Sequence, residues 1–134
     1  MSQNVILNHI ALSSNSEKDA NLFFTEILGI PLIKKFNISK NLANKIFEIN
    51  KNIEVLVYEN NKIKFEVFIT DKKYYKNFDH VCLEIYNKKE LIEKCKENNI
   101  EYLYANKDKK KLLFIIDKFG NLFEIKWKIL ILFD

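Results

Sequence analysis

The chain has 134 residues and contains no arginine, because all 22 of its basic residues are lysine. Arginine provides the planar, two-pronged contacts that dominate base recognition and the gripping of carboxylates. The net charge is only +4, and the lysines are spread over the whole chain. A modest lysine excess of this kind is typical of a solvated surface, so we do not expect a nucleic-acid-binding protein.

Cysteines are few, and long apolar runs are missing. Cys82 and Cys95 have neither metal-binding nor redox spacing, which favours a reduced, intracellular protein. The apolar tail at residues 129–133 is far too short to span a bilayer. Residues 1–20 include a polar run from Ser13 to Asp19, which does not fit a signal peptide. We therefore expect a cytoplasmic protein with no membrane-spanning segment.

Apolar and aromatic residues, by contrast, are plentiful. Hydrophobic residues make up 48% of the chain, which has 11 phenylalanines and 6 tyrosines. This composition provides a sizeable core and excludes intrinsic disorder. The length fits a single domain of ordinary size.

The hydrophobic pattern predicts the element order strand, helix and three strands, twice over. In the first round the strands are expected at residues 7–13, 32–38, 53–58 and 63–69, with a helix from Ser16 to Leu28. In the second round the strands are expected at residues 79–86, 102–105, 112–116 and 122–127, with a helix between Asn87 and Asn99. Residues 39–50 are ambiguous and allow a short helix. A polar linker near residues 71–77 separates the two rounds.

Local signals mark the ends of the expected helices. Ser16 with Asp19, and Asn87 with Glu90, have the spacing of N-terminal caps. Gly29 follows the first helix at the position where positive φ is favoured. Each helix is therefore bounded by its own residues.

The repetition is visible in the letters as well as in the pattern. Residues 8–12 (NHIAL) match residues 79–83 (DHVCL) at an offset of 71, and residues 65–67 (FEV) match residues 123–125 (FEI) at an offset of 58. The two offsets differ by 13 residues, about the length of the ambiguous segment 39–50. That segment is therefore expected to be an insertion in the first copy. The copies span about residues 5–70 and 78–127, with a tail at 128–134, in one domain.

Four residues that suit a metal occupy equivalent places in the two copies. The only two histidines, His9 and His80, lie near the start of the first strand of each copy, and Glu66 and Glu124 lie on the last strand. If the copies pair around a pseudo-twofold axis, the four side chains converge. Two imidazoles and two carboxylates suit Ni²⁺, Co²⁺ or Zn²⁺, and also Mn²⁺ or Fe²⁺. Positions left open on the ion would accept water or substrate oxygens.

A structural role is the competing interpretation of these residues. Taken singly, a strand histidine is more often a satisfied core residue, and a strand glutamate is usually exposed. Two neighbouring buried carboxylates without a metal would repel one another, and one would take up a proton. The symmetry and the use of both histidines favour the metal site. A site that keeps this geometry without binding metal is the alternative.

Several stretches resemble the vicinal-oxygen-chelate superfamily, which includes glyoxalase I, bleomycin-resistance proteins, epimerases and extradiol dioxygenases. They are residues 8–12, 23–29 (FFTEILG), 79–81 and 117–125 (DKFGNLFEI), and the resemblance extends from Asn8 to about Trp127. Lys118 stands where the family commonly has proline. The resemblance implies an α+β fold in which two βαβββ modules form an open, cupped mixed sheet. It also implies a homodimer.

By this resemblance, the ligand set His9, Glu66, His80 and Glu124 is that of glyoxalase I. The chain would then be a metal-dependent lyase or isomerase that transfers a proton on a metal-chelated hemithioacetal through an enediolate. Glu124 or Glu66 would be the catalytic base. The lack of arginine departs from the family, in which arginine usually grips glutathione, so lysines or another thiol are expected here.

Other members of the superfamily give alternative functions. Epimerases of the methylmalonyl-CoA type act on coenzyme A thioesters but typically have glutamine in place of Glu66. Dioxygenases need a further histidine, and fosfomycin-type transferases need basic phosphonate-binding residues that we do not identify. A metal-free binding module of the bleomycin-resistance type would use an apolar groove. The aromatic candidates for such a groove are Phe68, Tyr74, Tyr75, Phe78, Tyr102 and Tyr104.

Overall fold

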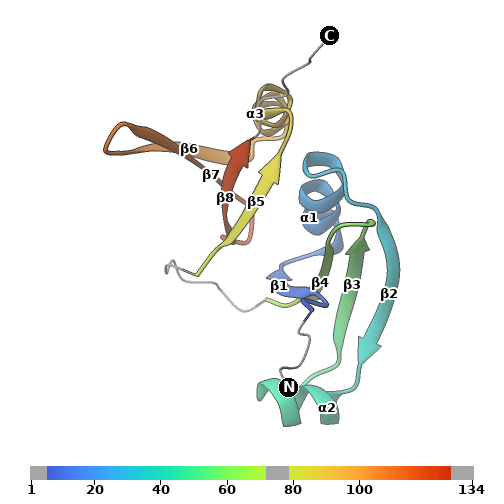
Figure 1. Ribbon diagram of the computed structural model, residues 1–134. Helices are drawn as coiled ribbons and strands as arrows, with labels where there is room; N and C mark the ends of the chain where they lie inside the picture. The colour runs from blue at the N-terminus through green and yellow to red at the C-terminus, as the bar shows by residue number, and fades with distance from the viewer. Residues whose placement is uncertain (1–5, 72–78, 128–134) are drawn as a thin grey trace, which may run out of the picture. The chain divides into compact units, whose positions relative to one another are not determined.

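A computed structural model describes residues 6–71 and 79–127 (Figure 1). The chain divides into two compact units, residues 1–72 (unit 1) and 73–134 (unit 2). Most of the predicted linker at residues 71–77, and the apolar tail at 128–134, lie outside the described residues. Among the described residues, no helix is long and apolar enough to cross a membrane.

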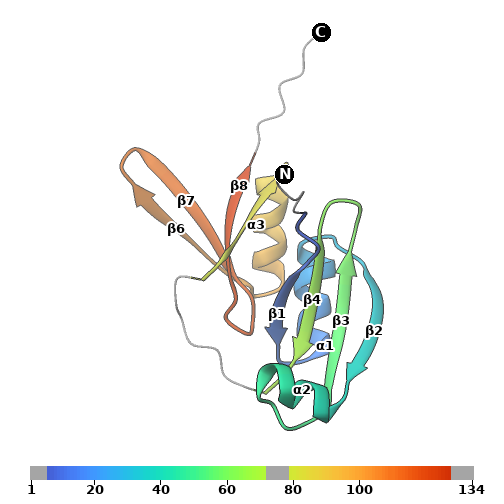
Figure 2. The same cartoon turned by 60° about the horizontal axis from the view of Figure 1, so that its bottom comes forward.

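Unit 1 is a four-stranded mixed sheet with a helix across one face (Figure 2). The strand order is β1-β4-β3-β2, with β1 parallel to β4 and the other neighbours antiparallel. Its elements are β1 (Ile10–Ser14), α1 (Glu17–Ala20), the π-helix η1 (Asn21–Ile27), β2 (Leu32–Ile38), α2 (Lys40–Phe47), β3 (Ile53–Glu59) and β4 (Lys64–Ile69).

Unit 2 repeats this topology. Its strand order is β5-β8-β7-β6, again with a parallel first pair and antiparallel neighbours. Its elements are β5 (Val81–Ile85), α3 (Lys88–Glu97), β6 (Glu101–Lys107), β7 (Lys110–Ile116) and β8 (Leu122–Trp127). Two mixed sheets with helices, built from the same order of elements, confirm the predicted α+β class and its two βαβββ modules.

The strand register confirms the repeat that the letters predicted. In the parallel pair of unit 1, Ala11 lies opposite Glu66, and in that of unit 2, Cys82 lies opposite Glu124. These residues are related by the same two offsets, 71 and 58 residues. The ambiguous segment contains α2, which confirms the short helix, whereas β6 and β7 of unit 2 are joined only by residues 108–109.

The first strand of each unit begins later than predicted. Leu7 to His9 precede β1, and Asp79 and His80 precede β5. The parallel register pairs Ile10 with Phe65, so residues 7 and 8 would face the β3–β4 turn rather than a strand. The register in unit 2 places residue 79 opposite the β7–β8 turn in the same way. Without a neighbouring strand there is no ladder of hydrogen bonds to extend.

The helix of unit 1 is also not the continuous α-helix that was predicted. The Ser16 hydroxyl caps it by accepting a hydrogen bond from the Asp19 amide, at 3.1 Å. After α1, however, the chain widens into the π-helix η1, in which the Leu28 amide donates to the Phe23 carbonyl. Apolar residues at helical spacing are nevertheless buried, namely Ala20, Phe23, Phe24 and Ile27. Gly29, with φ at +75°, ends the helix as expected.

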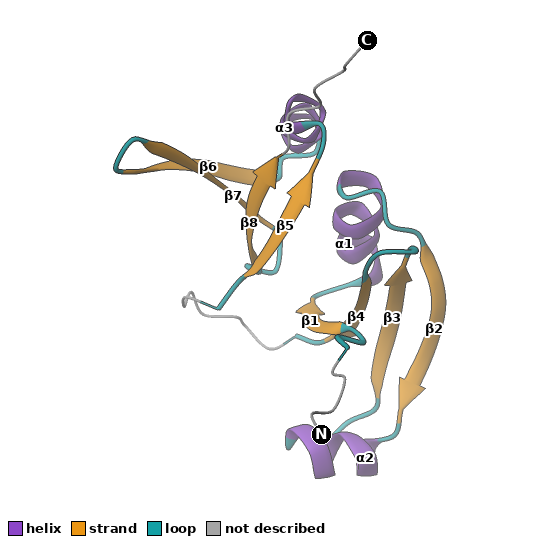
Figure 3. Ribbon diagram, viewed as in Figure 1, coloured by secondary structure: helices purple, strands orange, loops and turns teal. Residues whose placement is uncertain are grey.

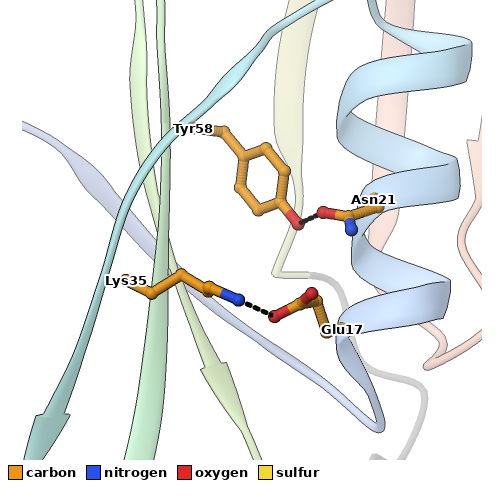
Figure 4. A network of polar contacts seen from close by, with 4 residues as sticks. All are labelled: Glu17, Asn21, Lys35 and Tyr58. Atoms are coloured by element: carbon orange, nitrogen blue, oxygen red, sulfur yellow. Dashed lines mark hydrogen bonds and ion pairs between the residues drawn. The ribbon is translucent and has the colours of Figure 1, made fainter.

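The helix packs on one face of the unit 1 sheet through aromatic rings. The Phe24 ring centroid lies 5.0 Å from that of Tyr58 and 5.1 Å from that of Phe65. Figure 4 shows two polar contacts beside this core. The Tyr58 hydroxyl of β3 donates to the Asn21 amide oxygen at 2.5 Å, and the Lys35 ammonium of β2 lies 3.1 Å from the Glu17 carboxylate.

Strand alternation then places Glu66 on the other face of that sheet. Phe65 and Val67, on either side of Glu66 in β4, are fully buried against the helix side. Successive strand side chains point to opposite faces, so Glu66 points away from the helix. We call this side of the unit 1 sheet its open face. Tyr58 and Phe65 therefore fix, through packing, the side on which Glu66 is presented.

Candidate metal centre

In unit 1, the structure brings His9 and Glu66 together. The His9 Nδ1 atom lies 3.3 Å from a Glu66 carboxylate oxygen and 2.7 Å from the Asn8 side-chain oxygen. The glutamate side chain is 17% exposed and the histidine side chain 35% exposed. The pair is therefore partly shielded from water, with its imidazole edge accessible.

In unit 2, the equivalent residues form an equivalent pair. The His80 Nε2 atom lies 3.3 Å from a Glu124 carboxylate oxygen. The Lys126 ammonium lies 3.7 Å from the other carboxylate oxygen, and the ring of Phe114 lies 6.4 Å from the imidazole ring, edge-on. Phe123 and Ile125 are buried on either side of Glu124, so the same alternation that orients Glu66 orients Glu124.

The geometry of each pair fits two neighbouring ligands of one divalent ion. Donor atoms that each lie about 2.1 Å from an ion and subtend about 90–110° at it are separated by about 3.0–3.4 Å. The observed nitrogen–oxygen separation of 3.3 Å in both pairs falls in this range. It is longer than the optimum of about 2.7–2.9 Å for a charge-assisted hydrogen bond. Imidazole and carboxylate are also the donor types that borderline divalent ions accept.

Each unit by itself brings together two candidate ligands and not four. Neither unit, over its described residues, gathers three or more side chains of His, Cys, Asp or Glu at one point. In each unit the structure brings together the histidine and the glutamate that occupy equivalent places in the repeat. A single centre formed by His9, Glu66, His80 and Glu124 stays a prediction.

Cys82 lies beside the unit 2 pair, since it is opposite Glu124 in the register. Burial and the nearby Glu124 carboxylate raise the pKa of the Cys82 thiol. A thiol with a raised pKa is protonated at neutral pH and is a poor nucleophile. Cys82 is therefore better described as a small neighbour of the His80–Glu124 pair than as a nucleophile.

Two hollows of unit 1 adjoin the His9–Glu66 pair, and sequence reasoning missed both. One, of about 180 Å³, contains His9 and lies against the β3–β4 turn; its lining includes Asn60, Lys62 and Lys64. The other, of about 230 Å³, is apolar and lies between the sheet and α2. The apolar residues at helical spacing in segment 39–50 could have indicated the apolar hollow, because they predict a helix with an apolar face.

The aromatic residues predicted to line a groove are distributed differently. Phe68 lines the apolar hollow, with Phe47 of α2 against it. Tyr102 and Tyr104 lie together on β6 of unit 2. The remaining candidates, Tyr74, Tyr75 and Phe78, lie outside the described residues.

Comparison with known proteins finds its matches among solved structures. No family model and no curated protein matches the chain. A glyoxalase family protein from Enterococcus faecalis is 21% identical, with a TM-score of 0.66 over 90% of this chain and 95% of that one. The fosfomycin resistance protein FosX from Listeria monocytogenes is 14% identical, with a TM-score of 0.71 over 94% and 95%. FosX from Mesorhizobium loti is 9% identical, with a TM-score of 0.68 over 92% of each chain.

These structures belong to one superfamily, and they share the paired modules described above. At such low identity the likeness concerns the fold. The chain has the fold of the vicinal-oxygen-chelate superfamily, in agreement with the resemblance of its sequence.

Proposed function

We propose that this protein is a divalent-metal-dependent enzyme, a lyase or isomerase of glyoxalase I type, whose ion is held by His9, Glu66, His80 and Glu124. The observation that carries the proposal is the duplicated histidine–glutamate pair, with the same 3.3 Å separation in both units. A fold neighbour adds support, since FosX from Listeria monocytogenes has been crystallised with Mn(II) and sulfate.

The four residues have different roles in the proposed reaction. A bound divalent ion supplies Lewis-acid stabilisation of negative charge on substrate oxygens. The two imidazoles serve as neutral donors, and the carboxylates balance the charge. Glu66 or Glu124 takes a proton from a substrate carbon and returns it to the neighbouring carbon. Both glutamates are less than one-fifth exposed, which limits the competition from water for that proton.

Anchoring of the thiol part of the substrate falls to lysine and amide groups. The lining of the polar hollow that contains His9 includes two lysines and two asparagines of the β3–β4 turn and β4, together with one acidic residue, Glu59. Ammonium groups bind carboxylates as point charges, in place of the two-pronged arginine contact. We propose that an anionic part of the thiol lies there. We also propose that the protein is a homodimer in the cytoplasm.

A metal-free binding module is the second candidate. The apolar hollow of about 230 Å³ in unit 1 favours it, because small-molecule sites are concave and mostly apolar. Unlike the enzyme, such a module needs no ion and converts no substrate, and both differences can be measured.

The first experiment is elemental analysis of the purified protein and of a Glu66→Ala, Glu124→Ala double variant. Glu54→Ala is the matched control, since Glu54 is a β3 glutamate on the helix side of the same sheet. We expect about one ion per chain in the wild type and in the control, and loss of the ion in the double variant. No ion after incubation with Ni²⁺, Co²⁺, Zn²⁺ and Mn²⁺ would overturn the metal proposal in favour of the binding module.

The second experiment uses the metal-loaded protein in turnover assays. The substrates are methylglyoxal hemithioacetals of several thiols, a coenzyme A thioester epimer, and fosfomycin as the resistance-type alternative. Conversion of a hemithioacetal supports the lyase. Turnover of only the thioester or only fosfomycin would assign another reaction to the same centre.

A further inference from the structure

The apolar hollow of unit 1 is formed by the segment that has no counterpart in unit 2. We call it the α2 cavity. It has a volume of about 230 Å³. Its walls come from β1, from α2 and the segment that follows it, and from β3 and the end of β4. They are Ala11, Leu12, Ser13, Phe47, Ile49, Ile53, Phe68 and Thr70.

The α2 cavity lies on the open face of the sheet, beside the histidine–glutamate pair. Ala11, which faces Glu66 in the strand register, is part of its wall. Phe68 is two residues beyond Glu66 on β4, so the two side chains point to the same side. A strand rises about 3.3 Å per residue, which places Phe68 about 7 Å along the strand from Glu66. A molecule held at Glu66 therefore reaches the cavity with a short chain.

The chemistry of the wall selects an uncharged, apolar group. The lining includes no charged side chain, and its only polar side chains are the hydroxyls of Ser13 and Thr70. A charged group placed there would lose its hydration without a partner, whereas an apolar group gains from leaving water. The Phe47 and Phe68 rings, 5.4 Å apart and edge-on, provide an aromatic wall.

The volume limits the size of that group. An apolar cavity of about 150 Å³ accommodates benzene. The α2 cavity, at about 230 Å³, has room for one ring with a short substituent, or for a branched aliphatic chain of similar size. Phe47 is 46% exposed, so its ring has surface left to bury when a group enters.

We propose that the α2 cavity binds the apolar end of the substrate, an aliphatic or single-ring aromatic group, while the substrate oxygens face the proposed ion at His9 and Glu66. The position relative to those oxygens rests on the proposed function. The binding of an apolar group by the cavity does not. The cavity then favours substrates that carry an aryl or bulky alkyl substituent over those that carry a small or charged one.

The test of the cavity uses the full chain without metal. Toluene is titrated into the protein and followed by NMR of the Ile49 and Ile53 methyl groups, with benzoate as the charged probe of similar shape. We expect saturable shifts with toluene and binding of benzoate weaker by about tenfold or more. Absence of saturable shifts, or shifts equally large at exposed apolar residues such as Leu103 of unit 2, would overturn the proposal.

Two variants of α2 make the test specific. Phe47→Ala removes a wall of the cavity, whereas Leu42→Ala removes a side chain of similar exposure, 44%, that does not line it. We expect the first to weaken toluene binding about tenfold and the second to leave it unchanged. Metal content stays at the wild-type value in both, so a failure of the metal proposal is seen separately. Equal toluene affinities in the two variants would contradict the assignment.

The loaded enzyme provides a final measurement. The ratio of kcat/KM for a phenylglyoxal hemithioacetal to that for the methylglyoxal compound reports on the apolar end alone. We expect Phe47→Ala to reduce this ratio by about tenfold, and Leu42→Ala to preserve it. An unchanged ratio in Phe47→Ala would place the substituent elsewhere.

Discussion

The two units follow the same chain path but differ between their second and third strands. In unit 1 that connection contains α2, and in unit 2 it is the short turn at residues 108–109 (Figure 3). The histidine–glutamate pair is present in both units, whereas the α2 cavity is formed by the inserted helix. In the proposed centre, the ion would take equivalent ligands from both copies, whereas a small substrate has two unlike ends. The duplicated pair would then hold the proposed metal, and the inserted helix would distinguish one end of the substrate from the other.

The surroundings of the two glutamates differ as well. In the strand register, Glu66 lies beside Val57 of β3, while Glu124 lies beside Phe114 of β7. His9 presents Nδ1 to its glutamate, and His80 presents Nε2. The copies thus retain the pair of ligand types while the residues around them have diverged. Experiments on equivalent positions in the two units measure how far the equivalence extends.

The largest effect is expected from the two histidines. His9→Ala and His80→Ala should each weaken metal binding by on the order of 100-fold or more, because each removes a direct ligand. Affinity is measured by competition with a chromophoric chelator. A loss confined to one histidine would contradict a centre shared equally by the units.

A smaller effect is expected from truncation of the two helix–sheet cores. Phe24→Ala should lower the free energy of unfolding by about 3–5 kcal/mol, because the ring is fully buried between Tyr58 and Phe65. Leu91→Ala in α3 should cost about 2–5 kcal/mol. Urea unfolding gives the totals, and amide hydrogen exchange locates each loss in its own unit. Faster exchange in unit 2 after Phe24→Ala would show that the cores are not separate.

The smallest effect concerns the turns that precede the glutamate strands. In unit 1 the uncharged Asn60 accepts from two backbone amides, and in unit 2 the Asp117 carboxylate accepts from three. Burial raises the pKa of the Asp117 carboxyl above its ordinary value of 3.8, against the lowering by its hydrogen bonds to Asn121, Gly120 and Phe119. The folded state therefore holds this proton more tightly than the unfolded state does.

The sign of the pH dependence follows from this difference. The contribution of Asp117 is fully present below the ordinary aspartate pKa and is lost as pH rises through the raised value. As the pH rises from about 3 to about 7, the free energy of unfolding of Asp117→Asn should therefore fall less, or rise more, than that of the wild type. Urea unfolding at several pH values measures this free energy. Asn60→Asp in the exposed turn of unit 1 is the control, and an identical pH profile for Asp117→Asn would refute the prediction.

Much of the fold was predictable because its signals are local. Ser16 and Asn87 cap their helices as their spacing predicted, and Gly29 has the positive φ expected after a helix. Asn99, which also has positive φ, ends the helix of unit 2 where the pair Asn98-Asn99 indicated. Caps and turns depend on residues a few positions apart, so the sequence displays them directly.

The errors lie where the outcome depends on distant partners. The start of β1 was misplaced because it is set by where β4 begins, far along the chain. The widening of the helix into η1 leaves the apolar pattern unchanged, so periodicity did not reveal it. The role of Phe47 was missed because its partner, Phe68, comes from a different element.

By itself, the sequence determined the twofold βαβββ order and the equivalence of His9 with His80 and of Glu66 with Glu124. Period-two alternation, caps and repeated letters are properties of short segments, and they survive without knowledge of the fold. Only the tertiary structure decided that each imidazole lies against its carboxylate at the start of a parallel strand pair, and that α2 forms one wall of a cavity beside Glu66. Both depend on contacts between residues far apart in the chain, whose distances are set by packing.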